Sequence, residues 1–241
     1  MTGELRANGL IFRTDRAGPE DAALVLLLHG FPQTRYAWRH QLPALADALG
    51  ARRFHLVGHD WGGQIAWWLA AQHPDRVATL SVLSRPHPAA FARAFAADAE
   101  QTARSRHHRL FQRADATERL LADDCALLLS ALRDQGVAAG DAAAYLDTLS
   151  ERAALDAAVN WYRAAGASGL AARACPEVAV PTLYLWGDRD ATVGRAAAEA
   201  TAGFVADRYR FEEIAGAGHF LSDEVPERVT ECIVAHLANG E

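Results

Sequence analysis

The sequence predicts one α/β domain with a mostly parallel sheet, into which a helical cap is inserted. Short apolar runs at residues 24–28, 54–57, 77–83 and 182–186, and a further strand pattern at residues 209–214, predict strands that alternate with helical patterns. From residue 87 to residue 172 the strand runs stop, and Ala/Leu/Arg-rich helical segments follow one another. A length of 241 residues suits one domain that carries an insertion. We therefore expect the core at residues 1–86 and 175–241 and the cap at residues 87–174.

Each element follows from a local pattern. Weak alternation at residues 9–14 predicts an edge strand, whereas the unbroken apolar run Leu24–Leu28 is typical of a strand buried on both faces of a parallel sheet. Helical periodicity predicts a first helix that ends before Gly50, a plausible cap. The helices that we expect in the core span residues 36–49, 64–72 and 226–237.

Composition narrows the range of partners. The net charge is −6 and there is no cluster of basic residues, so a nucleic-acid partner is not expected. No apolar run is long enough to cross a bilayer and the first residues lack a secretory pattern, so we expect a cytoplasmic protein without a membrane partner. The three cysteines are far apart and fit neither a disulfide framework nor a zinc site. No phosphate-binding glycine loop or metal-ligand spacing occurs, so we expect a small-molecule substrate and neither cofactor nor metal.

The segment Gly58-His-Asp-Trp-Gly-Gly63 stands between a predicted strand and a predicted helix. This is the context of a nucleophile elbow, in which glycines allow a tight turn that raises one side chain above the sheet. A serine is usual there, and here the residue is Asp60. A carboxylate is already ionised, so it can attack a saturated carbon and form an ester with the enzyme. The alternative is an aspartate that only caps the following helix.

Three further segments supply partners for Asp60. In His29-Gly-Phe-Pro32, the main-chain N–H of Phe31 is expected to form an oxyanion hole with that of Trp61. Asp190 and His219 each follow a predicted strand, in the chain order nucleophile, acid, histidine. We expect His219 to be the general base and Asp190 to orient it, with Asp188 as the weaker candidate. His59 is expected to be structural.

Together these segments resemble the epoxide hydrolase branch of the α/β-hydrolases. The resemblance also includes Pro86-His-Pro88, Asn160-Trp-Tyr-Arg163 and Trp186-Gly-Asp-Arg-Asp190, and it extends over nearly the whole chain. It implies an α/β-hydrolase fold and two cap tyrosines that hold and protonate the epoxide oxygen. Tyr162 matches one of them. The alternative for Tyr162 is a core aromatic residue on a helix.

The chain departs from the family pattern in two ways. His107 stands where the second tyrosine is expected, and a histidine donates a proton as a cation mostly below pH ~6.5. Relatives also place another strand and most of a helix between the first buried strand and the elbow strand, a gap of roughly 40 residues. We expect the sheet to be one strand shorter than usual, with strand 9–14 pairing directly against strand 24–28.

Three functions remain open at this stage. The first is hydrolysis of epoxides to diols through an ester on Asp60, which water activated by His219 then cleaves. The second is dehalogenation of haloalkanes by the same pair; the resemblance disfavours it, because Phe31 stands where many dehalogenases have an Asn. The third is a catalytically impaired protein that only binds small ligands.

Overall fold

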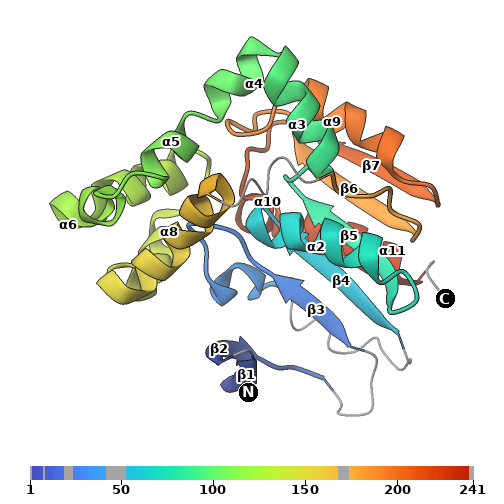
Figure 1. The fold of residues 1–241 in the computed structure, drawn as a ribbon. Helices are drawn as coiled ribbons and strands as arrows, with labels where there is room; N and C mark the ends of the chain where they lie inside the picture. Colours follow the sequence, from blue (N-terminus) through green and yellow to red (C-terminus); the bar gives the residue numbers. More distant parts are fainter. Residues whose placement is uncertain (1, 8, 19–23, 42–52, 168–173, 239–241) are drawn as a thin grey trace.

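The computed structural model describes residues 2–7, 9–18, 24–41, 53–167 and 174–238. Its centre is a parallel sheet of five strands in the order β3-β4-β5-β6-β7 (Figure 1). The sheet has the same strands that the apolar runs predict: β3 (Val25–Leu28), β4 (Phe54–His59), β5 (Val77–Leu83), β6 (Thr182–Gly187) and β7 (Tyr209–Ile214).

Helices cover both faces of this sheet. Alternate residues of β4 point to opposite sides, so that Leu56 lies in one core cluster and Val57 in the other. The first cluster packs against α2 (Trp61–Gln72), α3 (Pro88–Ala97) and α9 (Arg195–Ala200), which is followed by η3 (Thr201–Phe204). The second packs against α11 (Pro226–Ala238), with η1 (Arg35–Trp38) and α10 (Leu221–Glu224) close by. Burial on both faces explains why β3 and β6 are mostly apolar, whereas β7 at the edge of the sheet carries Arg210, Glu212 and Glu213.

Between β5 and β6 the described residues form six helices. They are α3, α4 (Ala99–Arg104), α5 (His107–Phe111), α6 (Ala116–Arg133), α7 (Ala139–Leu149) and α8 (Arg152–Ala167). The backbone of α6 leaves helical geometry at residues 122–125. Figure 1 shows α5, α6 and α8 grouped beyond the end of β4, which leads into α2. The ring of Tyr162 on α8 contacts that of Trp61 at the start of α2. The helical insert therefore covers the edge of the sheet at which the strands end.

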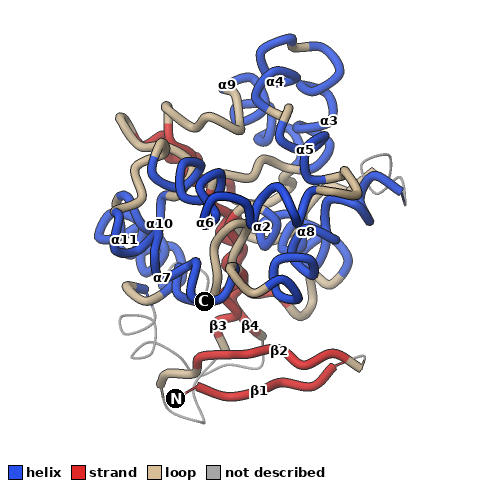
Figure 2. The backbone as a smooth tube through the Cα atoms, turned by 90° about the vertical axis from the view of Figure 1, so that its left-hand side faces the viewer, coloured by secondary structure: helices blue, strands red, loops and turns tan. Residues whose placement is uncertain are grey.

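The predicted pairing of the strand at residues 9–14 is wrong. This strand, β2 (Leu10–Asp15), pairs antiparallel with β1 (Thr2–Ala7), and the two form a separate sheet through a turn in which Gly9 has a φ of +77°. Figures 1 and 2 show this hairpin outside the parallel sheet, on the side of β3. The hydrogen-bond partner of β2 is therefore β1 and not the strand at residues 24–28.

The segment between the first buried strand and the elbow strand is short, as expected. In the described part of the chain β3 pairs directly with β4, and Leu28 lies beside Gly58 in a parallel register. Most of the helix predicted at residues 36–49 lies outside the described residues, and its first residues form the 3₁₀ turn η1. Among the described helices, none is both long and apolar enough to cross a membrane.

Candidate active site

The elbow at Asp60 forms where β4 ends and α2 begins. Asp60 has φ 49° and ψ −116°, an unusual backbone conformation for a residue with a side chain. A Cβ atom on Gly62 would collide with the main-chain oxygen of Leu28, so this turn requires glycine. The side chain of Asp60 makes no capping hydrogen bond with α2. The helix-cap alternative is therefore wrong, and the carboxylate is free for another role.

The carboxylate of Asp60 faces the loop that follows β3. Its Oδ1 accepts a hydrogen bond from the main-chain N–H of Phe31 at 3.1 Å. A Cβ atom on Gly30 would lie 2.7 Å from this oxygen, so only glycine allows the loop to come so close. The Asp60 side chain is largely buried, with 13 % of its surface exposed. The main-chain N–H of Phe31 is therefore directed at the carboxylate of Asp60.

His219 lies between two carboxylates. Its Nδ1–H donates to Oδ2 of Asp190 at 2.8 Å, and its Nε2 lies 3.7 Å from Oδ2 of Asp60. Asp188 instead accepts from the main-chain N–H of Gly216. Asp190 rather than Asp188 is thus the residue that contacts the imidazole.

Charge interactions within this group shift the protonation equilibria in opposite directions. Burial alone would lower the pKa of His219, but Asp190 and then Asp60 raise it to about 10. Burial alone would raise the pKa of Asp60, but the hydrogen bond and the charge of His219 hold it below its ordinary value. At neutral pH the site therefore holds a carboxylate on Asp60 next to an imidazolium.

The loop of Asp190 contains a residue that the sequence did not indicate. The hydroxyl of Thr192 donates to Oδ1 of Asp190 at 2.7 Å, and its oxygen lies 2.7 Å from Nδ1 of His219. The main-chain N–H groups of Thr192 and Val193 also donate to Oδ1 of Asp190. From the helical insert, the side-chain N–H of Gln101 on α4 donates to the Thr192 carbonyl at 2.9 Å. The acid is therefore fixed by its own loop and by the helical insert.

The main chain around His219 is fixed as well. The carbonyl of His219 accepts from Nε2–H of His59 at 2.9 Å and from the hydroxyl of Ser84 at 2.7 Å. Glu224 accepts from the N–H groups of Gly218 and Phe220, on either side of the histidine. Burial lowers the pKa of His59 to about 4, so its ring is neutral and holds the histidine loop in place.

Tyr162 and His107 meet above the elbow. The Tyr162 ring lies 5.0 Å from that of Trp61, 5.8 Å from that of Phe31 and 6.3 Å from that of His107. Burial and then the charge of Asp60 raise the pKa of Tyr162 well above 10, so the phenol keeps its proton. Burial lowers the pKa of His107, whose Nδ1–H donates to the Arg104 carbonyl at 3.1 Å. Neutral His107 therefore presents only the lone pair of Nε2.

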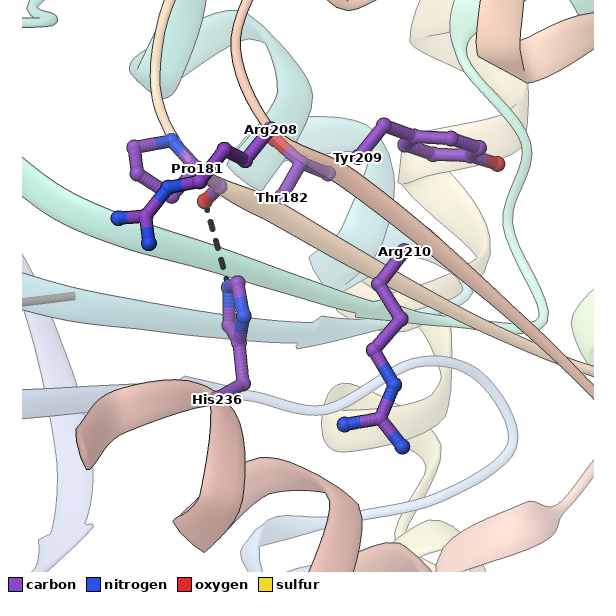
Figure 3. Close-up of a pocket in the computed structure, with 6 residues that line it drawn as sticks. All are labelled: Pro181, Thr182, Arg208, Tyr209, Arg210 and His236. Atoms are coloured by element: carbon purple, nitrogen blue, oxygen red, sulfur yellow. Dashed lines mark hydrogen bonds between the residues drawn. The ribbon is translucent and has the colours of Figure 1, made fainter. Parts of the chain in front are cut away.

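A separate pocket of about 250 Å³ lies at the opposite edge of the sheet, where β6 and β7 begin (Figure 3). There His236 contacts the Pro181 carbonyl at 3.3 Å, and burial lowers the pKa of its imidazole to about 4. Asp60 and His219 follow strands that end at the other edge. This pocket is therefore no part of the site around Asp60.

Comparisons with known proteins agree with this architecture. Residues 46–226 match the sequence model of the family described as alpha/beta hydrolase fold. Epoxide hydrolase 3 of Xenopus tropicalis is 30 % identical over 95 % of this chain and 75 % of its own length. Epoxide hydrolase 4 of Mus musculus is 29 % identical over 97 % of this chain and 78 % of its own length.

Solved structures show the same fold. The epoxide hydrolase of Bacillus megaterium in complex with an inhibitor superposes with a TM-score of 0.85, at 21 % identity, over 98 % of this chain and 100 % of that one. The alignment with the mouse protein runs over 281 positions although this chain has 241 residues, so at least 40 positions of the relative have no counterpart here. That difference is as large as the missing strand and helix that the sequence indicates.

Proposed function

Because the chain is a hydrolase of the α/β-hydrolase family, similar to the epoxide hydrolases, we propose that it hydrolyses epoxides to diols through an ester on Asp60. The position of His219, with Asp190 on one side of its ring and Asp60 on the other, is the observation that carries this proposal. A carboxylate nucleophile needs no base for its attack, whereas hydrolysis of the resulting ester does. The arrangement supports both steps in one place.

In the first step a carboxylate oxygen of Asp60 attacks an epoxide carbon and the C–O bond of the ring breaks. The phenol of Tyr162 gives its proton to the leaving oxygen, which becomes the first hydroxyl of the diol. Because burial makes the phenolate strongly basic, it takes a proton back from the imidazolium of His219. This transfer leaves the imidazole of His219 neutral. The neutral form is favoured because the ester removes the negative charge of Asp60, which is one of the causes of the raised His219 pKa.

In the second step neutral His219 takes a proton from water, and the resulting hydroxide attacks the ester carbonyl. The N–H of Phe31, which bonds Asp60 Oδ1 in the free protein, stabilises the oxyanion together with the N–H of Trp61. The intermediate collapses as His219 returns the proton to the leaving alkoxide and releases the diol. Asp60 then ionises, and its proton restores the imidazolium.

We also propose that residues 87–174 act as the cap that encloses the substrate. The rings of Phe31, Phe111 and Tyr162 pack edge to face over the elbow, with centroids 4.8–5.8 Å apart. Such a lining excludes water from the nucleophile and favours substrates with an apolar part. The cap supplies Tyr162 from α8 and His107 from α5.

A panel of epoxides and haloalkanes, assayed for diol and halide together, tests this proposal. We expect diol from epoxides, and no turnover in Asp60→Ala. The control variant is Asp188→Ala, because Asp188 is exposed and contacts Gly216 rather than His219. Halide release without diol would assign dehalogenation instead. Full activity in Asp60→Ala, or no reaction with any substrate, would refute the proposal, and the second result would favour a binding protein.

A further inference from the structure

Arg85 is a cation inside the fold that forms no direct ion pair with the carboxylates of the described residues. It follows β5 after one residue, and its side chain is mostly buried. Its Nε and Nη2 donate to the side-chain oxygen of Gln64 at 3.0 and 2.8 Å. No ion pair joins it to any described Asp or Glu, and its Nη1 bonds to no described residue. Buried guanidinium groups are usually paired with a carboxylate. Because Nη1 bonds to no described residue, the N–H groups of this nitrogen are unused donors.

The surroundings fix where this charge lies. The guanidinium carbon stands 4.3 Å from the ring centre of Phe91 and 5.9 Å from that of Trp61, which follows the nucleophile in sequence. The indole N–H of Trp67 donates to the Arg85 carbonyl at 2.9 Å and fixes the main chain. The guanidinium is therefore held between the start of α2 and the start of α3, next to the elbow.

The charge of Arg85 also acts on the groups of the site. It interacts with Asp60 and Tyr162, and it lowers the pKa of His107 and of His108. Asp60 is the strongest of the charges that favour the protonated form of Arg85. In the resting site the negative charges of Asp60 and Asp190 balance the positive charges of His219 and Arg85.

Formation of the ester changes this balance. Asp60 becomes neutral when it is alkylated, and Arg85 then loses its main counter-charge in a poorly hydrated environment. A negatively charged group on the substrate, placed next to Arg85, would replace the lost negative charge of Asp60. A planar guanidinium with unused N–H groups binds a carboxylate in preference to neutral groups.

We propose that Arg85 binds an anionic substituent of the substrate, so that the preferred substrates are epoxides that carry a carboxylate. This inference rests on the proposed function, because it concerns the substrate of the same site. Arg85 acts here as a specificity-determining residue and takes no part in proton transfer.

Binding of unreactive compounds tests the inference independently of turnover. Calorimetry compares 3-phenylpropanoate with 3-phenylpropanamide, which differ mainly in charge. We expect the wild type to bind the carboxylate about 10- to 100-fold more tightly than the amide. Arg85→Gln should abolish this preference and retain the affinity for the amide. The control is Arg93→Gln, an exposed arginine on α3 that lies over the ring of Phe204, and it should keep the wild-type preference.

Two results would overturn the inference. The first is equal affinity of the wild type for the two compounds, and the second is an equal loss of affinity for both in Arg85→Gln. Steady-state kinetics with 3-phenyloxirane-2-carboxylate and its amide test whether this binding also affects turnover. We expect Arg85→Gln to raise KM for the carboxylate and to leave KM for the amide unchanged. If the carboxylate preference depends on Arg85 but neither epoxide gives a diol, the proposed function fails and the anion site stands.

Discussion

Thr192→Val removes one hydroxyl from the centre of the Asp190–His219 pair. In the wild type this hydroxyl donates to Asp190 Oδ1 and lies 2.7 Å from His219 Nδ1, so it can accept part of the imidazole N–H bond. Valine has nearly the same shape and keeps the main-chain N–H that also bonds the carboxylate. The change therefore tests the hydroxyl alone.

The contacts that remain set the size of the effect. Asp190 keeps its bonds from two main-chain N–H groups and from His219, so the pair persists with one bond fewer. A hydrogen bond to a charged group contributes roughly 1.5–3 kcal/mol, and the remaining contacts offset part of this loss. We expect the ester-hydrolysis step to slow by about 10-fold, which corresponds to about 1.4 kcal/mol. Attack by Asp60 needs no base and should change much less.

Single-turnover kinetics with an excess of enzyme separate the two steps. Mass spectrometry of quenched samples measures the amount of ester directly. Thr192→Val should accumulate the ester, and Thr192→Ser should restore its hydrolysis. Equal slowing of both steps, or a failure of serine to rescue, would mean that the residue contributes only to packing and would refute the reasoning.

Three other predictions follow from the same geometry. His219→Gln should form the ester and fail to hydrolyse it, so that the intact protein gains the mass of the epoxide; an unmodified mass after incubation would contradict this. Tyr162→Phe should slow epoxide opening by about 10²-fold or more and leave any haloalkane reaction nearly unchanged, whereas equal losses would remove its role as proton donor. The pKa of His219 is raised from 6.5 to about 10, so its contribution to stability is complete below about pH 6.5 and disappears as the pH rises towards 10. Urea unfolding at pH 6 and pH 9.5 should show this loss, and Asp60→Asn should reduce it because one cause of the shift is gone; an identical loss in that variant would exclude the coupling.

The parallel sheet and the elbow could be predicted because their sequence patterns have strong physical causes. A strand covered on both faces needs apolar residues on both sides, as Leu56 and Val57 are on opposite sides of β4. In the elbow, Gly62 is required by close contact with the main chain of β3, and Gly58 by close contact with the main chain of Gly62 and Gly63. The order of Asp60, Asp190 and His219 then follows from the order of the strands.

The N-terminal hairpin was predicted only in part. Residues 2–7 carry little of the alternation that marks a strand, and their pairing depends on the turn at Gly9. Leu5 and Leu10 remain more than half exposed, so burial did not impose a clear pattern. Without the first strand of the hairpin, the second had no partner except the run at residues 24–28.

Several site residues could not be found from the sequence, because their roles depend on tertiary contacts. Thr192 and Glu224 are of types that are common in loops and at helix ends, and only the fold brings them to Asp190 and to the main chain around His219. Arg85 stands directly before Pro86-His-Pro88, a segment that contributes to the family resemblance. Arg85 itself is not part of that resemblance. That Arg85 is buried and forms no ion pair with a described carboxylate becomes visible only when its neighbours are known.

The covalent role of Asp60 is tested most directly by one turnover in water enriched in ¹⁸O. The ester mechanism takes the new diol oxygen from the carboxylate of Asp60 and leaves the water oxygen on the protein. We predict an unlabelled diol from the first turnover and ¹⁸O in the peptide that contains Asp60. A labelled diol with an unlabelled peptide would mean that water attacks the epoxide directly, and it would contradict the central claim.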